Sequence, residues 1–131
     1  MRTLANTRKF RLSDSFVEPY KDKNVPWGPV GYVTYKRTYS RRLSEFAPDA
    51  TGSEEWYQTC RRVVEGMFNT QKEHVVRLGL EWNDSKAQRT AKDAYDRLFH
   101  LKWTPPGRGL WMMGTKFVEE KTAAGLFNCA F

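Results

Sequence analysis

The sequence is poor in cysteine and histidine and has no long apolar run. Two cysteines and two histidines among 131 residues cannot build a disulfide framework, and no Cys/His cluster has metal-ligand spacing. No apolar stretch approaches the roughly 20 residues that span a bilayer. The basic residues of the first 11 positions lack the apolar segment of a secretory signal. We therefore expect a protein of the reducing cytoplasm, without a metal site and without membrane contact.

Phosphate-binding loops and nucleic-acid motifs are also missing. The segment Pro106–Gly109 places glycines around Arg108, but it lacks the downstream Lys-Ser/Thr of a P-loop and the strand before it. A plain turn is the favoured interpretation, although such glycines can bring backbone amides near an anion. No helix-turn-helix, zinc-finger or RNA-binding consensus occurs.

The chain has what one packed domain needs. Apolar residues make up 40% of the sequence and aromatic residues 15%, which is enough to form a core and argues against disorder. A length of 131 residues allows a single modest core and excludes a full catalytic barrel. The net charge of +7 favours anionic partners such as nucleotides or nucleic acid.

Two stretches have the apolar spacing of long amphipathic helices. Between positions 51 and 79, apolar residues recur every three or four positions, Thr51 and Glu54 have capping-box spacing, and Gly79 provides a stop. The second stretch begins with Asp84 or Ser85 as the cap and runs to the Pro-Pro-Gly break at 105–107. The sequence therefore predicts a mainly α fold.

The flanking regions are less regular. Phe10, Leu12 and Phe16 suggest a short strand or an extended arm, and a short helix is predicted between Tyr32 and Leu43. After the break, an apolar run at 110–113 precedes a charged loop at 116–121 and a buried strand at 125–131. We divide the chain into an arm with a short helix (1–50), a helical region (51–104), and a turn, apolar segment and strand (105–131). A final strand without a partner indicates the front portion of a larger protein.

Two features have both a chemical and a structural interpretation. Cys129 lies in the apolar strand, where a lone cysteine is more often a packing residue than a reactive one, and Cys60 lies on the apolar seam of the first long helix. Basic and tyrosine side chains alternate between positions 32 and 42, a pattern that suits nucleic acid but that more often forms a solvated or salt-bridged face. The basic members are Lys36, Arg37, Arg41 and Arg42.

Four strings together resemble one enzyme family. They are PWGPVGYVTYKRTYSRRL (26–43), EEWYQTCRRVVEGMFNTQKEHV (54–75), AQRTAKDAYDRLFHLKWTPPGRGLWMMGT (87–115) and NCAF (128–131). In this order they resemble the N-terminal portion of the adenosylcobalamin-dependent, class II ribonucleotide reductases, most closely the monomeric branch that reduces ribonucleoside triphosphates. The sequence shows no N-terminal ATP-cone pattern, as expected of a form without that regulatory module.

The resemblance implies a fold and a chemistry. It implies the helical region that precedes a ten-stranded α/β barrel, with NCAF as the first barrel strand. A thiyl radical on a cysteine of the barrel would abstract the ribose 3′ hydrogen, water would leave from C2′, and a cysteine pair would supply two electrons by forming a disulfide. Cys129 matches the first cysteine of that pair, and Asn128, Arg108 and Gly109 would lie near the substrate ribose and phosphates.

The same resemblance implies partners. They are a ribonucleoside triphosphate, adenosylcobalamin bound mainly by the remainder of the enzyme, that remainder of the barrel, and a thioredoxin-type reductant, with no direct nucleic-acid contact. The chain alone would be inactive, because the radical cysteine and the second reducing cysteine are not in it. The alternative is a small basic nucleic-acid-binding module built on the two long helices.

Overall fold

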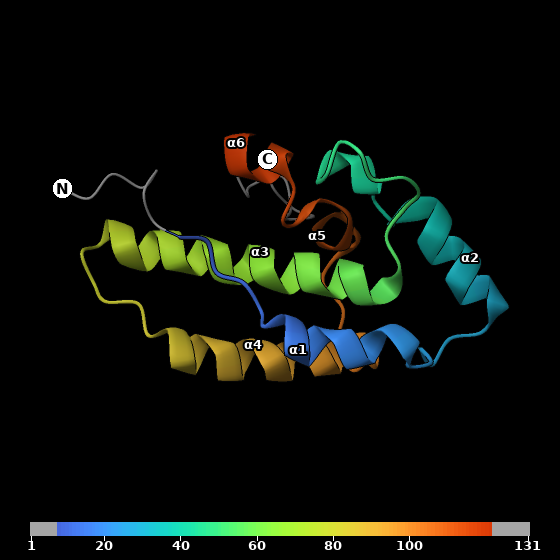
Figure 1. The fold of residues 1–131 in the computed structure, drawn as a ribbon, viewed down its shortest axis with the longest axis horizontal. Coiled ribbons are helices and arrows are strands. Elements are labelled where there is room, and N and C mark those ends of the chain that lie inside the picture. Colours follow the sequence, from blue (N-terminus) through green and yellow to red (C-terminus); the bar gives the residue numbers. More distant parts are fainter. Residues whose placement is uncertain (1–7, 122–131) are drawn as a thin grey trace.

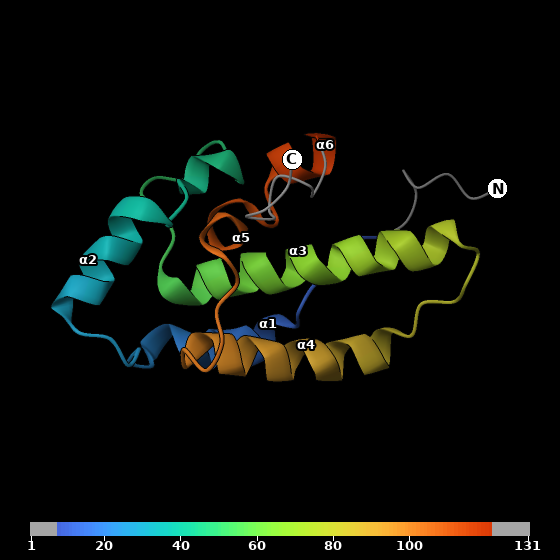
Figure 2. The same cartoon turned by 180° about the vertical axis from the view of Figure 1, so that it is seen from behind.

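The computed structural model describes residues 8–121 and is organised around one long helix. Helix α3 (Trp56–Arg77) runs through the centre and α4 (Asp84–Phe99) returns antiparallel beside it. Helices α5 (Gly107–Met112) and α6 (Lys116–Lys121) lie on the other side of α3 (Figures 1 and 2). Residues 8–121 contain no strand, which confirms the mainly α prediction for this part of the chain. The predicted strand at 125–131 lies outside the described residues.

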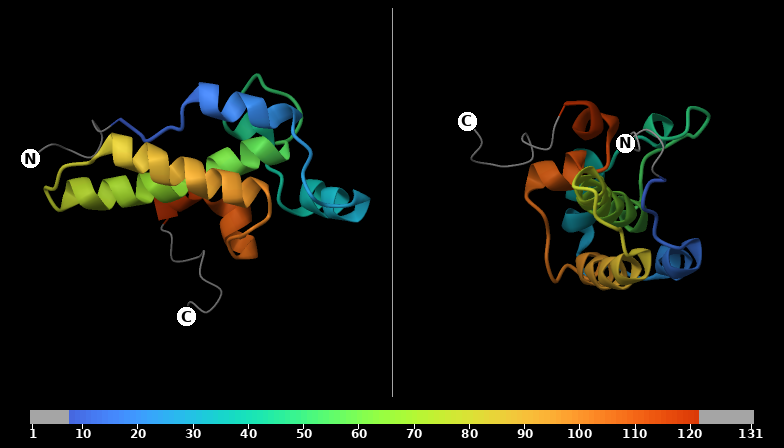
Figure 3. Two further views of the ribbon diagram at one scale, coloured as in Figure 1. Left: turned by 90° about the horizontal axis from the view of Figure 1, so that it is seen from below. Right: turned by 90° about the vertical axis from the view of Figure 1, so that its left-hand side faces the viewer.

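The core forms where α3 meets α4, as the apolar spacing predicted. Cys60, Val63 and Val64 of α3 are fully buried, as are Ala91 and Tyr95 of α4. None of the described helices is both long enough and apolar enough to cross a membrane. The end-on view in Figure 3 shows α3 between α4 and the α5–α6 segment, so both sides of α3 are occupied.

The caps of both long helices differ from the prediction. Helix α3 is capped by Glu55, whose amide donates to the Gln58 side chain at 2.8 Å, and not by Thr51. Glu54 is instead buried in the interior, and the helix begins four residues later than a Thr51 cap would place it. Helix α4 is capped by Asn83, whose Oδ1 accepts from the Lys86 amide at 3.0 Å, and not by Asp84 or Ser85.

The ends of the two helices rely on left-handed residues. Gly79, at φ +74°, follows the end of α3, which confirms the predicted stop. Helix α4 ends at Phe99, well before the prolines that were expected to end it. Leu101, at φ +58°, reverses the chain there, and the Lys102 amide donates to the Arg97 carbonyl at 2.9 Å.

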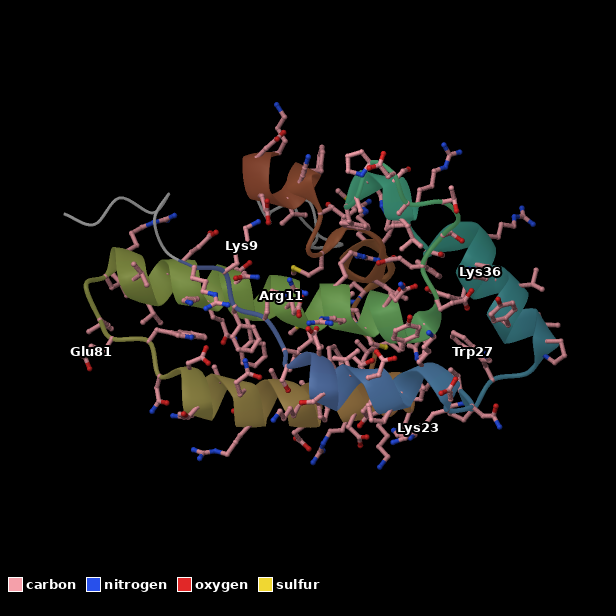
Figure 4. All side chains as sticks on the ribbon, viewed as in Figure 1. Lys9, Arg11, Lys23, Trp27, Lys36 and Glu81 are labelled. Carbon is pink, nitrogen blue, oxygen red and sulfur yellow. The ribbon has the colours of Figure 1, made fainter. Side chains whose placement is uncertain are left out.

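The N-terminal arm lies in extended form along α3, where side chains replace a neighbouring strand. Phe10 and Leu12 are buried, and their backbone groups bond to Arg61, Glu65 and Asn69, which are four residues apart on α3. The arm then enters α1 (Asp14–Val17) and the 3₁₀ helix η2 (Glu18–Asp22). The extended arm thus includes Phe10 and Leu12, but the expectation is wrong for Phe16, which lies in α1. Figure 4 shows Lys9 and Arg11 where the arm crosses α3.

The remaining elements are short. Helix α2 (Pro29–Thr38), close to the predicted position, leads to the 3₁₀ helix η3 (Leu43–Glu45) and to a single bridge between Arg42 and Ser53. The expected loop at 116–121 is wrong, because this segment forms α6. The polar sequence of this segment gives no apolar spacing that would indicate a helix. The helix begins after Thr115, whose carbonyl accepts from the Val118 and Glu119 amides.

Candidate functional site

The segment from Pro105 to Thr115 carries the predicted substrate-binding residues. It was expected to be a turn with an apolar run, but it forms helix α5 followed by a sharp corner at Gly114. Arg108 lies in the first turn of α5 and is exposed, and it makes no hydrogen bond or ion pair with residues 8–121.

Gly109 is buried one residue further along α5. A Cβ atom built on Gly109 would lie 3.2 Å from the Cβ of Pro105, which is tighter than ordinary van der Waals contact. The glycine thus lets the helix fold back closely on Pro105. It shapes the first turn of α5 through this backbone contact, not through a side chain.

A buried ion pair attaches α5 to α3. The Nε of Arg62 donates to Glu54 Oε2 at 2.9 Å, and one terminal nitrogen donates to Glu54 Oε1 at 3.1 Å. The same guanidinium donates to the Leu110 carbonyl at 3.0 Å and to the Met113 carbonyl at 2.6 Å. The two side chains are only 5% and 3% exposed, so these bonds form away from water.

The corner after α5 also approaches α3 very closely. Gly114 has φ +78°, and a Cβ atom on it would lie 2.5 Å from the carbonyl oxygen of Arg62. Across the same contact, a Cβ atom on Gly66 would lie 2.6 Å from the Gly114 amide nitrogen. Two glycines therefore allow the backbones of α3 and the corner to touch.

Glu54 connects this contact to α2. Its Oε1 accepts from the Arg41 amide and from Thr59 Oγ1, both at 3.0 Å. The Tyr35 hydroxyl lies 2.5 Å from Thr59 Oγ1 and 3.1 Å from the Glu54 carbonyl oxygen. Burial raises the pKa of Tyr35 above its usual range. The Glu54 carboxylate thus bonds to α3 and to the Arg41 amide after α2, and it is linked to α5 through Arg62.

Two of the four basic side chains near the end of α2 are engaged within the protein. Lys36 donates to Glu55 and to the Glu54 carbonyl, both at 2.9 Å, and Figure 4 shows it on α2. Arg41 pairs with Glu45 at 2.6 Å and lies over the ring of Trp111 at 5.2 Å. Only Arg37 and Arg42 of the four are exposed, so the salt-bridged interpretation accounts for half of the cluster.

The cysteines and histidines offer no metal chemistry in the described residues. Cys60 is buried in the core, and burial raises the pKa of its thiol, as expected of a packing residue. His100 bonds to the Asp96 carbonyl at 2.8 Å, and His74 is exposed on α3. No group of three or more His, Cys, Asp or Glu residues within positions 8–121 could hold a metal ion. Asn128 and Cys129 lie outside the described residues.

A cavity beside α3 does not contain a ready ligand site. It measures about 600 Å³ and lies between the arm, α3, η3 and the corner at Gly114. Its central charged side chains already pair with each other: Arg61 with Glu65, and Arg62 with Glu54. Adenosylcobalamin finds no set of free ligands here, so these residues do not fit a cofactor site.

Glu54 and Arg62 were not predicted as functional residues. The sequence placed Glu54 beside Glu55 at a helix N-terminus, where an exposed carboxylate is ordinary. Nothing in the spacing of the two residues signals that they are buried together with the end of another helix, because that end comes from a segment 48 residues further along the chain.

Comparison with known proteins confirms the resemblance. The family model described as "Ribonucleotide reductase alpha domain" matches residues 12–115. The chain is 41% identical over 127 residues to a probable adenosylcobalamin-dependent ribonucleoside-triphosphate reductase of Dictyostelium discoideum, covering 95% of this chain. It is 41% identical over 132 residues, or 98% of the chain, to the adenosylcobalamin-dependent ribonucleoside-triphosphate reductase of Euglena gracilis.

A solved structure shows the same fold. The crystal structure of a B12-dependent, class II ribonucleotide reductase superposes with a TM-score of 0.67 at 36% identity, over 82% of this chain and 14% of that chain. The chain spans 16% and 17% of the length of the Dictyostelium and Euglena relatives. It therefore corresponds to a small part of those enzymes.

Proposed function

The chain belongs to the family of ribonucleotide reductase alpha domains, and we propose that it is the N-terminal part of a class II enzyme that reduces ribonucleoside triphosphates. The observation that carries this proposal is the match over residues 12–115 together with the 41% identity to relatives named as triphosphate reductases. The proposed enzyme works in the cytoplasm with a thioredoxin-type reductant.

In this proposal Cys129 is one of the two cysteines that reduce the substrate. A thiyl radical on a cysteine of the remaining barrel takes the ribose 3′ hydrogen, and water leaves from C2′. The thiols of Cys129 and of a second cysteine then give two electrons and two protons to the sugar and join as a disulfide. The 3′ hydrogen returns from the first cysteine to the sugar, which restores the thiyl radical, and the external reductant reopens the disulfide. Adenosylcobalamin, held by the remainder of the enzyme, supplies the initial radical when bound.

The residues of α5 have a binding role. Arg108 is exposed and has no partner within residues 8–121, so its guanidinium can bind substrate phosphates. Gly109 allows the tight first turn that presents Arg108. Asn128, next to Cys129, completes the proposed set near the ribose. The segment 105–131 is thus the part of the chain that meets the barrel.

The test joins this chain to the rest of a reductase. In a chimera, the chain replaces the matching residues of the Dictyostelium relative, and cobalamin-dependent reduction of ribonucleoside triphosphates is measured with a thioredoxin system. We expect Cys129→Ser to abolish turnover and Cys60→Ser to retain it. Equal loss in both variants, or full turnover of the Cys129→Ser enzyme, would refute the redox role.

A further inference from the structure

Arg62 lies on α3, and its side chain reaches the end of α5. A six-residue helix has little stability of its own, and its last carbonyls have no partners within the helix. From the neighbouring helix α3, Arg62 donates to one of them, that of Leu110, and to the carbonyl of the C-cap residue Met113. The end of α5 is therefore capped by a side chain that is itself fixed in the core.

Glu54 fixes the direction of that guanidinium. It accepts two of the Arg62 hydrogen bonds, which leaves the other donors of the planar group aimed at the α5 carbonyls. At Gly114 the backbone of the corner also lies directly against the Arg62 carbonyl of α3. The direction of α5 relative to α3 is thus set by one buried pair and one backbone contact.

Stability alone does not account for such a pair. Charges buried together lose hydration that their attraction only partly restores, so apolar side chains of similar size often serve the fold equally well. What an apolar pair cannot do is hold two carbonyl groups in a defined direction. The helix held in this way carries Arg108, whose side chain has no partner within residues 8–121.

We propose that Glu54 and Arg62 are positioning residues that hold α5 so that Arg108 meets the phosphate groups of the nucleotide. This role rests on the proposed reductase function, because it assumes that α5 faces the substrate. Neither residue touches the nucleotide in this proposal. They act through the Leu110 and Met113 carbonyls.

The matched control lies one position earlier on the same helix. Arg61 pairs with Glu65 at 2.7 Å and donates to the Leu12 carbonyl at 2.7 Å, so it holds the N-terminal arm as Arg62 holds α5. Arg61→Met therefore removes an arginine of the same helix and the same kind of contact, but from a different segment.

The experiment uses the full-length chimera and two measurements. The first is the dissociation constant for a ribonucleoside triphosphate and for the corresponding nucleoside, measured by equilibrium dialysis. The second is hydrogen exchange of peptides from the arm, from α4 and from residues 107–121. The principal variant is Glu54→Gln with Arg62→Met, which removes both charges together and avoids leaving one of them buried alone.

We expect the double variant to bind the triphosphate about tenfold more weakly, the loss of roughly one charged contact. Nucleoside binding should stay unchanged, and exchange should quicken in residues 107–121 but not in α4. The single variant Arg62→Lys, which keeps the charge and Glu54, should bind the triphosphate more tightly than the double variant does. Arg108→Ala should weaken binding in the parent chimera but add nothing in the double variant, because the two changes remove the same contact. Arg61→Met should quicken exchange only in the arm.

Several results would overturn the positioning role. These are equal weakening by Arg61→Met, faster exchange throughout α4, unchanged triphosphate binding, or full additivity with Arg108→Ala. A parent chimera that binds triphosphate without reducing it would refute the proposed reductase function and leave the positioning role to be judged by binding. A parent that binds no triphosphate would refute both.

Discussion

Asn69 on α3 and Phe10 on the arm form a reciprocal pair. The Phe10 amide donates to Asn69 Oδ1 at 2.7 Å, and Asn69 Nδ2 donates to the Phe10 carbonyl at 3.2 Å. One amide side chain thus provides both bonds that a neighbouring strand would give. Glu65 accepts from the Leu12 amide and Arg61 donates to the Leu12 carbonyl, so side chains of α3 bond the arm where a sheet would use a neighbouring strand.

Asn69→Ala should therefore loosen the arm. Two partly buried backbone groups lose their partners, which we expect to lower the free energy of unfolding by about 1–3 kcal/mol. The measurement is urea unfolding together with the rate of proteolysis within residues 8–17. Thr70→Ala, which removes only an exposed hydroxyl bonded to its own helix, should stay within about 0.5 kcal/mol of the parent protein. Equal effects of the two changes would contradict the pairing.

Gly114 should tolerate alanine much less well than another left-handed glycine. At Gly114 both the φ of +78° and the 2.5 Å approach to the Arg62 carbonyl oppose a Cβ atom, whereas Gly52, at φ +84°, has open space around it. We expect Gly114→Ala to cost roughly 3 kcal/mol or more, and Gly52→Ala about 1 kcal/mol. Urea unfolding separates the two, and similar losses would show that the close approach has little weight.

The sequence was informative where a pattern repeats and where one chain segment decides the outcome. The spacing of apolar residues predicted α3 and α4, and the alternation of Phe10 and Leu12 predicted the arm. The predicted N-caps of α3 and α4 were wrong by one to four residues, because several polar residues before each helix are suitable cap residues. Glu54 could not act as a cap residue because its side chain is buried in an ion pair with Arg62.

The candidate site rests on a different kind of prediction. Arg108 and Gly109 were proposed by resemblance to a family and stay predictions, since their local sequence indicated only a turn. The Leu110 and Met113 carbonyls, at the end of α5, accept hydrogen bonds from Arg62, which lies on another helix. No local pattern contains that information, which is why α5 and the role of Glu54 required the structure.

Cys60 should be unreactive while the protein is folded. Its side chain is fully buried, and burial raises the pKa of the thiol, so little thiolate meets solvent. In a Cys129→Ser variant, Cys60 is the only cysteine left. We expect a thiol reagent to modify it at least about a thousandfold more slowly in buffer than in denaturant, because reaction requires opening of the fold. A native rate close to the denatured rate would place Cys60 at the surface.

Nucleic-acid binding should be weak and only slightly sensitive to salt. Lys36 and Arg41 are engaged with acidic residues, which leaves Arg37 and Arg42 of the basic cluster for phosphates. Two phosphate contacts predict a slope of about −2 in the logarithm of affinity against the logarithm of salt concentration. Fluorescence anisotropy with a labelled duplex measures this slope. A much steeper slope that Arg37→Gln with Arg42→Gln abolishes would instead support a nucleic-acid-binding module.

Alkaline solution should destabilise the fold through its buried tyrosines. Burial raises the pKa of Tyr35 and Tyr95 above the usual 10.0, so the folded protein holds phenol protons that the unfolded chain releases near pH 10. The stability that these protons contribute is complete below that pH and is lost as the pH rises above it. The free energy of unfolding, measured in urea between pH 8 and about 11, should begin to fall above the ordinary thiol value of 9.0, because burial also raises the pKa of Cys60, and should fall more steeply above pH 10.

The slope of that decline identifies the groups responsible. Tyr95→Phe removes one titrating phenol, along with its 2.9 Å bond to the Tyr57 carbonyl, and should lessen the decline by up to roughly 1.4 kcal/mol per pH unit. The lost bond lowers stability at every pH, so it shifts the curve without changing its slope. An unchanged slope in both Tyr95→Phe and Tyr35→Phe would mean that other groups govern alkaline unfolding, and that neither hydroxyl is held from water as the structure places it.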